Sequence, residues 1–392
     1  MTEQQRGLIL LIKSASTGQV QELPTDFDLV SAFDIAKKHG ITALAYYGAC
    51  KCGVDTTAET MQSAFSTVCK CILTDERQRA ELTRLLDSFD KHGIKYMPLK
   101  GVNLKSLYLT PEMRMMGDAD ILISPEQYDG TIRPLMIELG YEEGAESDHE
   151  LIWNKSSLHV ELHKRLIPSY NKDYYAYFGD GWSLAKIKST ESERYSMTDE
   201  DELIYLFTHF AKHYRDSGIG LRHIIDLWVY ESHHPNMARD YLTSELHKLQ
   251  LDKFYLNIKN TLDVWFNDAV ADEITDFITD TIFKSGQYGK KQVGVVSSAL
   301  KESKSEKNAN KIKLNHILRS AFQSVDYLKV YYPILNKAPV FLPFIWVIHF
   351  LRRVFTKNKL KNYVKNINEI NDDKISEYQK ALNFVGLDFN FK

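Results

Sequence analysis

The sequence predicts an α+β protein, in which a small mixed sheet has helical regions before and after it in the chain. Apolar residues recur at helical spacing up to residue 92 and again after residue 198, whereas short runs between them alternate with a period of two. With 392 residues and 44% hydrophobic content, the chain can form substantial cores. We therefore predict a helical region over 1–92, an α/β core over 93–197, a helical region over 198–300 and a basic helical region over 301–392.

The first region is predicted to be all-helical. Helices are expected at the N-terminus and over 27–40, 42–50 and 57–91, the last as one or two helices. The end of this region is amphipathic and stops at Gly93. The first residues lack the basic stretch and the small-residue cleavage site of a signal peptide, so we predict a mature N-terminal helix and a cytoplasmic protein.

Four cysteines form two C-x-C pairs in this helical region, Cys50 with Cys52 and Cys69 with Cys71. Zinc sites usually use C-x-x-C turns, so we predict reduced, packed thiols, with a structural zinc site as the alternative. The low cysteine content also agrees with a cytoplasmic location.

Two aspartates near residue 120 carry the most directed chemistry. The elements predicted around them are a strand over 96–99, a turn at Gly101, a helix over 102–109 and a strand over 118–123. Asp118 and Asp120 share one face of the second strand, because side chains alternate along a strand. At about 4 Å two carboxylates repel by on the order of 4 kcal/mol at an effective dielectric of ~20. Such a pair favours a raised pKa or a bound cation, and a divalent metal satisfies it.

A predicted hairpin supplies a third carboxylate. Its strands cover 149–153 and 158–162. His159, Glu161 and His163 share one face of the second strand, while apolar residues occupy the other face and can pack on helices.

Helices are predicted on both sides of this hairpin in the chain. Ser124 and Pro125 indicate the start of a helix that runs to Gly140, and no element is predicted over 167–197. Thr198 and the three acids after it indicate another helix start. Further helices are predicted over 221–230, 238–249, 253–266 and 271–283.

The C-terminal region is basic although the whole chain carries a net charge of −3. Residues 301–313 are predicted to be a charged linker or mobile loop. Residues 327–368 contain eight Lys or Arg and no acid, and include an apolar run over 340–350 that is too short to cross a bilayer, which needs ~20 apolar residues. One interpretation is a buried helix followed by a solvated basic face. The other is a weak contact of 327–368 with a membrane surface or a polyanion.

Nucleotidyl or phosphoryl transfer needs carboxylates for Mg²⁺ and cations or backbone N–H groups for the phosphates. Asp118, Asp120 and Glu161 are the candidate metal ligands. The candidate phosphate-binding groups are the N-terminus of the helix that begins at Gly101, together with Lys100 and Arg114.

In this order, these segments resemble the polymerase-β-type nucleotidyltransferase superfamily, and more narrowly an uncharacterised bacterial nucleotidyltransferase family. The matching stretches are Leu99-Lys100-Gly101, Tyr108, Pro111, Arg114, Asp118-Ala119-Asp120 and Glu161-Leu162-His163. Similar features extend over roughly residues 30–230, namely Ala36, His39, Gly40, His209, His213, Arg222 and Asp226. The last 110 residues match no family that we can name.

The resemblance implies a nucleotidyltransferase-type sheet and transfer of a nucleoside monophosphate from an NTP to an acceptor. Asp118, Asp120 and Glu161 are implied as ligands of Mg²⁺ or Mn²⁺, and Glu161 as a group that helps to activate the acceptor hydroxyl. The superfamily usually has a serine after the glycine turn, whereas Val102 and Asn103 follow Gly101 here. Lys100 or Asn103 can take over its contact with the phosphates. The sequence does not specify the acceptor (small molecule, sugar, protein or RNA), the base or the oligomeric state.

Two other functions compete with this one. His159, Glu161 and His163, with one of the two aspartates, could form the zinc site of a metallohydrolase. The fold could also be a catalytically inactive binding or scaffold module.

Other polar residues have structural alternatives. His209 and His213 lie four residues apart on a helix, which suits either metal chelation or hydrogen-bonded core histidines. Asp226 is expected to pair with Arg222 one turn before it, while the arginine can still face the nucleotide cleft.

Overall fold

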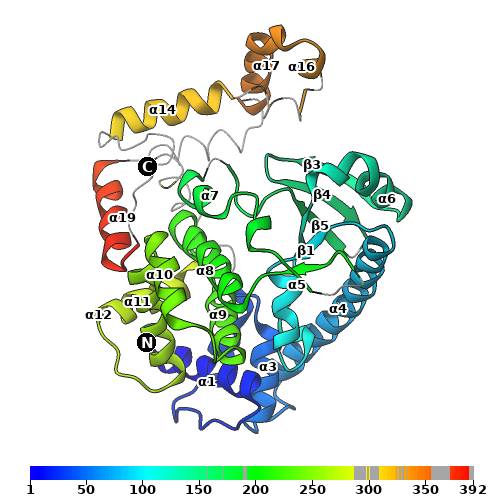
Figure 1. The fold of residues 1–392 in the computed structure, drawn as a ribbon. Coiled ribbons are helices and arrows are strands. Elements are labelled where there is room, and N and C mark those ends of the chain that lie inside the picture. The colour runs from blue at the N-terminus through cyan, green and yellow to red at the C-terminus, as the bar shows by residue number, and fades with distance from the viewer. Residues whose placement is uncertain are drawn as a thin grey trace.

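The computed structural model of the chain describes residues 1–156, 158–169, 171–188, 192–286, 297, 300, 309–323, 325, 328, 331–332, 334–354 and 371–387. Its architecture is α+β, as predicted. A five-stranded mixed sheet lies between α8 on one side and α6 on the other (Figure 1).

Four helices precede the sheet, as expected: α1 (Glu3–Thr17), α2 (Leu29–Lys38), α3 (Thr42–Lys51) and α4 (Glu59–Lys91). The last is one continuous helix of 33 residues. The four cysteines lie in or next to α3 and α4 as half-buried free thiols. Within the described ranges, no cysteine joins a cluster of three potential metal ligands.

The sheet contains β1 (Tyr96–Pro98), β2 (Ala119–Ile123), β3 (Glu142–Glu146), β4 (Glu150–Lys155) and β5 (Leu158–His163), in the order β1-β2-β5-β4-β3. β2 and β5 are parallel, and the other neighbours are antiparallel. The four predicted strands are present. β3 was not predicted, because all five of its residues are exposed and its sequence has no apolar alternation.

The two faces of the sheet differ in polarity. On one face, Ile121, Val160 and Trp153 pack against Leu85 and Phe89 of α4 in a common buried cluster. The opposite face carries the polar side chains, and the strand register places them side by side, with Asp120 opposite Glu161 and Glu150 opposite His163. The predicted alternation therefore creates a sheet with one buried face and one functional face.

Two predicted helices are shorter than expected. The segment after Gly101 forms α5 (Gly101–Leu104) and then a 3₁₀ turn. The segment from Pro125 to Gly140 forms a 3₁₀ turn, a π turn and only then α6 (Arg133–Glu138). Pro134 has no N–H and cannot continue a regular helical ladder from the preceding residues, so the α-helix proper begins beside it. Ser124 bonds Glu126 through its hydroxyl and caps no backbone N–H.

The chain after the sheet is again helical. The segment predicted without elements holds α7 (Lys172–Phe178) and the short strands β6 (Lys186–Ile187) and β7 (Tyr195–Ser196). Five helices then follow, all of them predicted: α8 (Asp199–Asp216), α9 (Leu221–His233), α10 (Arg239–Lys248), α11 (Asp252–Phe266) and α12 (Glu273–Ser285). The hydroxyl of Thr198 accepts from the backbone N–H of Asp201 and caps α8, as expected.

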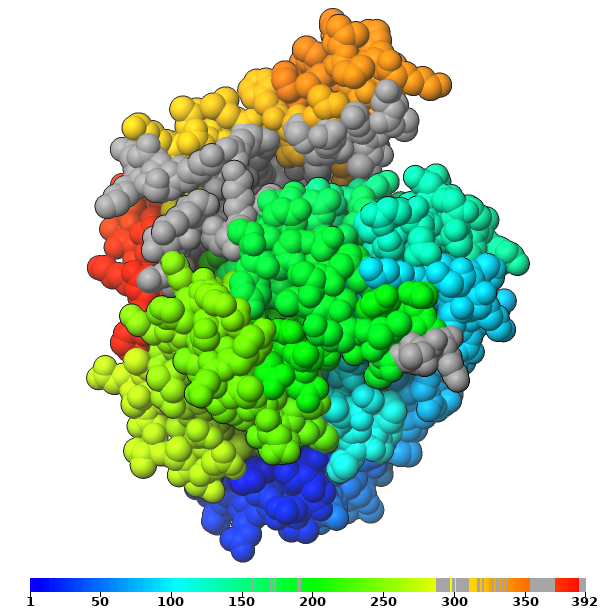
Figure 2. Space-filling view, in the orientation of Figure 1, coloured from blue at the N-terminus to red at the C-terminus, as the bar shows by residue number. Residues whose placement is uncertain are grey.

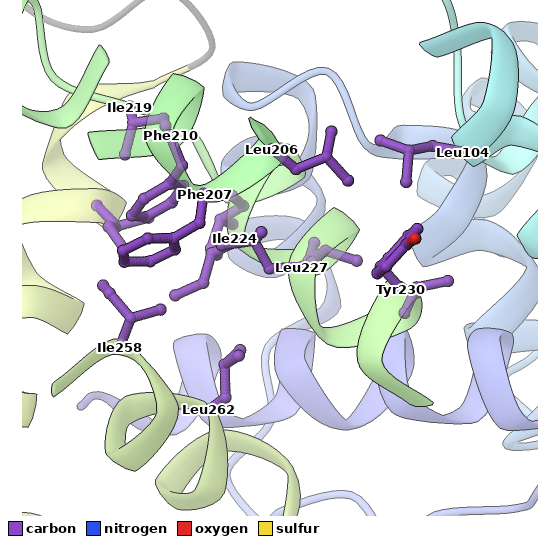
Figure 3. Packing of buried hydrophobic residues seen from close by; sticks show 14 of the residues in the cluster. Leu104, Leu206, Phe207, Phe210, Ile219, Ile224, Leu227, Tyr230, Ile258 and Leu262 are labelled. Atoms are coloured by element: carbon purple, nitrogen blue, oxygen red, sulfur yellow. The ribbon is translucent and has the colours of Figure 1, made fainter. Parts of the chain in front are cut away.

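The largest core joins the N-terminal helices to those that follow the sheet. Leu8 and Ile12 of α1 belong to the same buried cluster as the side chains of α8, α9 and α11. Figure 3 shows Phe207, Ile224 and Ile258 from these three helices pointing toward one another. Helices from before and after the sheet in the chain thus share one buried core beside the polar face of the sheet.

The C-terminal region contains α14 (Ala309–Ala321), α16 (Ile334–Lys337), α17 (Leu342–Val354) and α19 (Asp372–Phe384). The predicted linker over 301–313 is wrong in its last part, because residues 309–313 begin α14; residues 301–308 lie outside the described part. Residues 355–368 of the predicted basic segment 327–368 also lie outside the described part of the chain. No helix among the described residues is long and apolar enough to cross a membrane.

Candidate functional site

A cleft of about 570 Å³ lies between the polar face of the sheet and helices α8 and α9. Its sheet side is formed by the Lys100-Gly101 turn, the segment before β2 and the polar residues of β2, β4 and β5. Its helical side carries histidines, Lys212 and Arg222. Six of the seven predicted site residues line this cleft, namely Asp118, Asp120, Glu161, Lys100, Gly101 and Arg114.

Asp120 is the buried centre of the acidic side. Its Oδ1 lies 2.7 Å from Nζ of Lys100 and 2.8 Å from Nε2 of His163. Burial works to raise the pKa of this carboxyl, but the charge of Lys100 and the hydrogen bond from His163 outweigh it, so the pKa falls well below its usual value. Asp120 is therefore an ionised carboxylate in a site with almost no exposure to water.

Glu161 has the opposite electrostatic character. Burial, together with the charges of Asp120, Asp118 and Glu150, raises its pKa to about 8. Its Oε2 lies 3.7 Å from Nε2 of His163. Two neighbouring carboxyls on adjacent strands thus differ in protonation at neutral pH, because only Asp120 has a close cationic partner.

Asp120, Glu161 and His163 form a group whose potential ligand atoms all lie within 4.8 Å of one another. A second such group contains His149, Glu150 and His163. Asp118 is half-buried and lies outside both groups, although it lines the same cleft. The metal site considered from the sequence also included Asp120, His159, Glu161 and His163. The structure brings Asp120, Glu161 and His163 together, and His159 lies outside both groups.

His163 connects these two groups. Burial lowers its pKa, so we assign a neutral ring whose Nε2–H donates to Asp120. Nδ1 is then a buried nitrogen without a partner among the described residues. His159, by contrast, lies at the exposed side, with Nδ1 2.6 Å from Oδ1 of Asn154 and Nε2 3.8 Å from Glu161.

The turn before α5 brings two cations to the carboxylates. Lys100 has a positive φ of 44°, which is uncommon for a residue with a side chain. At the next position, a Cβ would lie 2.9 Å from Nη1 of Arg114 and 3.3 Å from Cγ of Met116, so a side chain there would displace the guanidinium. Gly101 therefore allows the close approach of Arg114.

Arg114 is held by a buried network that sequence reasoning assigned differently. Asp226 accepts from Nε and Nη2 of Arg114, each at 2.9 Å, and from the hydroxyl of Tyr108 at 2.7 Å. The expected pairing of Asp226 with Arg222 is wrong, because the bidentate geometry of Arg114 takes both carboxylate oxygens. Arg222 instead lies 3.4 Å from the carbonyl of Met115 through Nη1 and lines the cleft.

Asn103 is turned toward the helical side of the core. Its Nδ2 donates to the carbonyl of Pro98 at 2.9 Å and to Glu202 at 2.8 Å. It lies outside the lining of the cleft.

The helical wall carries a cluster of imidazoles. Nε2 of His209 and Nε2 of His213 lie 3.1 Å apart, and the ring of His223 is 6.0 Å from that of His213. Burial, aided by Lys100 and His213, lowers the pKa of His209 well below its usual value. His209 and His213 do line the cleft, where they contact each other.

Sequence reasoning missed His149, Glu150, Lys212 and His223 as cleft residues. The strand register would have revealed Glu150, because a hairpin that pairs it with His163 places both on the polar face. Lys212 and His223 carry no comparable signal, since they reach the cleft only through the packing of α8 and α9.

The site of this α+β protein thus combines carboxylates on adjacent parallel strands with a glycine turn that begins a helix. The sequence model of the family described as "Uncharacterised nucleotidyltransferase" matches residues 25–267. The chain belongs to this family. Comparisons with curated proteins and with solved structures gave no match.

Proposed function

We propose that this protein is a metal-dependent nucleotidyltransferase that moves a nucleoside monophosphate from an NTP to an acceptor. The observation that carries the proposal is the convergence of Asp120, Glu161 and His163, with Asp118 nearby, in a cleft that also contains cationic and imidazole side chains. Family membership supports the same reaction class. We expect this activity in the cytoplasm.

The donor set fits a divalent cation. Asp118, Asp120 and Glu161 would hold Mg²⁺ or Mn²⁺, and a buried imidazole beside them favours Mn²⁺, since Mg²⁺ prefers oxygen ligands. The bound metal supplies neutralisation of the charge that develops on the phosphates. Lys100 forms an ion pair with Asp120 at 2.7 Å, and a divalent cation at Asp120 would take the place of its ammonium group.

The cationic side chains of the cleft have separate tasks in this proposal. Lys100 is next to both the carboxylates and the N-terminus of α5, so it can contact a phosphate when a metal replaces it at Asp120. Nη1 of Arg114 faces Gly101 and is the part of the guanidinium that Asp226 does not bind. Asn103 is engaged elsewhere and takes no part. Gly101 allows the close approach of Arg114 and of the phosphates.

Glu161 is the proposed proton acceptor. The acceptor hydroxyl attacks the α-phosphorus of the NTP, a new O–P bond forms, and the bond to pyrophosphate breaks. The hydroxyl proton passes to the carboxylate of Glu161, which must first lose its own proton because its pKa of about 8 keeps it largely protonated at neutral pH.

The test is transfer of label from α-labelled NTPs to components of a bacterial lysate. We expect labelling by the wild-type protein with Mn²⁺, loss of labelling with Glu161→Gln, and no loss with Glu142→Gln on the exposed strand β3. Unchanged labelling with Glu161→Gln would remove this residue from catalysis. Calorimetry of Mn²⁺ with the Asp118→Asn, Asp120→Asn double variant tests the ligands, and equal affinity would refute them.

The competing function is a non-catalytic binding or scaffold module. The absence of a serine after Gly101 and the ion pair of Lys100 with Asp120 favour it. A ligand at 100 times its Kd raises the unfolding free energy by ~2.7 kcal/mol, so a nucleotidyltransferase must show a thermal shift with NTP and metal. No shift with any NTP would favour the scaffold, and Zn²⁺-dependent hydrolysis without transfer would favour a metallohydrolase built on the histidines.

A further inference from the structure

Helix α17 exposes an apolar stripe to solvent. Phe344, Val347, Ile348 and Leu351 follow the spacing i, i+3, i+4, i+7, which places them on one face of the helix. Their exposed fractions lie between 44% and 68%. The two residues before the helix, Val340 and Phe341, continue this exposed surface. The interpretation of the apolar run 340–350 as a buried helix is therefore wrong for this face of α17.

The orientation of α17 is set by its other face. Ile345 is buried against Leu328 and Leu335, with Trp346 packed beside them. Nε1 of Trp346 donates to the carbonyl of Gln323 at 2.8 Å. The outer stripe is thus a surface that this local packing leaves exposed.

The segment around the stripe is strongly basic. Residues 327–368 carry eight Lys or Arg and no acid, in a chain whose net charge is −3. Lys337 and Arg352, at either end of the apolar surface, are both exposed. This segment combines an exposed apolar stripe with positive charges that no acidic residue of the segment offsets.

We propose that α17 binds the surface of an anionic lipid membrane, with Phe344, Val347, Ile348 and Leu351 in the headgroup boundary. A 13-residue helix is about 20 Å long, which suits a position in the plane of the membrane. Lys337 and Arg352, at either end of the apolar surface, contact lipid phosphates, because juxtamembrane Lys and Arg bind anionic leaflets. α17 lies at one end of the molecule, away from α8 and α9 (Figures 1 and 2), so this docking is separate from nucleotide binding in the cleft.

A lipid surface matches both properties of the segment better than other occupants do. Two copies of the chain that met through this surface would bring two acid-free basic segments together, and their charges would repel. A nucleic acid would satisfy the charges but leave the apolar stripe in water. An anionic membrane, unlike either of these, covers the stripe and neutralises the charge at once.

The experiment is co-sedimentation of the full chain with phosphatidylcholine vesicles, with and without phosphatidylglycerol. We expect binding only to the anionic vesicles, with binding at least about tenfold weaker at high salt. The variant Phe344→Ser, Val347→Ser should lose binding by a similar factor. Its matched control is Leu256→Ser, a comparably exposed leucine on α11 far from this segment.

Circular dichroism and thermal unfolding are the controls for folding of the variants, which we expect to remain folded because the substituted side chains are exposed. Equal binding to neutral and anionic vesicles, or equal binding by the stripe variant, would overturn the proposal. Concentration-dependent dimerisation that the stripe variant abolishes, without vesicle binding, would assign the surface to self-association. Retention on RNA without vesicle binding would also overturn it.

Discussion

The raised pKa of Glu161 makes metal binding depend on pH. With a pKa of about 8, roughly nine in ten Glu161 side chains are protonated at pH 7 in the metal-free protein. A cation that uses this carboxylate must therefore displace a proton. One pH unit below the pKa corresponds to about 1.4 kcal/mol, and because water reaches part of the side chain, we expect about 1 kcal/mol of metal affinity to be lost at pH 7 relative to pH 9.

Isothermal titration of Mn²⁺ in buffers of different ionisation enthalpy measures the Mn²⁺ affinity and the number of protons released per bound ion. We expect release of close to one proton per ion at pH 7 and almost none at pH 9 or above. The Mn²⁺ affinity should rise up to about tenfold for each pH unit between pH 6 and pH 8 and then level off.

Two variants make the result specific. Glu161→Gln should bind Mn²⁺ more weakly and without this proton release, whereas Glu142→Gln should behave as wild type. An Mn²⁺ affinity independent of pH, or proton release that persists in Glu161→Gln, would refute the assignment of Glu161 as a protonated ligand.

The same pKa has a consequence for stability without metal. The folded-state pKa of Glu161 is above its unfolded value, so between about pH 4.5 and pH 8 the folded state holds a proton that the unfolded state has lost. The unfolding free energy therefore falls as pH rises through this window. Glu161→Gln should remove this loss and raise the melting temperature at pH 8, as measured by calorimetry.

Three further predictions concern buried charges. Arg114→Met should cost about 3–5 kcal/mol in chemical denaturation because it leaves Asp226 buried without a charge partner, and the double variant with Asp226→Leu should lose less than Arg114→Met alone. Additive losses would contradict this coupling. Burial lowers the pKa of His39 to about 4, so the unfolding free energy should fall by up to about 3 kcal/mol from pH 6.5 to pH 4. Measurements of stability against pH should show no such fall for His39→Gln. Lys100→Met should lower NTP affinity, since it removes the cation that lies beside the carboxylates of the cleft; calorimetry that shows unchanged NTP affinity would exclude this role.

The polar face of the sheet could be predicted from the sequence because strands alternate with a period of two. Asp118 and Asp120 on one strand, and His159, Glu161 and His163 on another, each define a face without knowledge of the fold. Their juxtaposition depends on parallel pairing of β2 with β5, which the structure shows and the sequence did not specify. The helices were predictable for a similar reason, because their apolar periodicity reflects burial.

The electrostatic network could not be predicted in this way. Asp226 binds Arg114 from 112 positions earlier in the chain, so the local alternative, Arg222 one turn away, was the stronger sequence signal. β3 was missed because it forms through backbone pairing with β4 alone, without apolar side chains. Ion pairs between residues far apart in the chain, and edge strands without apolar side chains, could therefore be identified only from the three-dimensional structure.

The lysine in the glycine turn is explained by the burial of Asp120. A carboxylate with 4% exposure would be protonated in an apolar site unless a cation stays beside it. Burial opposes the charge of Lys100 as well, yet its contact with Asp120 raises the pKa of the ammonium. The pair thus keeps both groups ionised before any metal arrives, and a divalent cation can exchange with the ammonium without a proton transfer at Asp120. Glu161, which has no such partner, is the carboxyl at which the proton must leave.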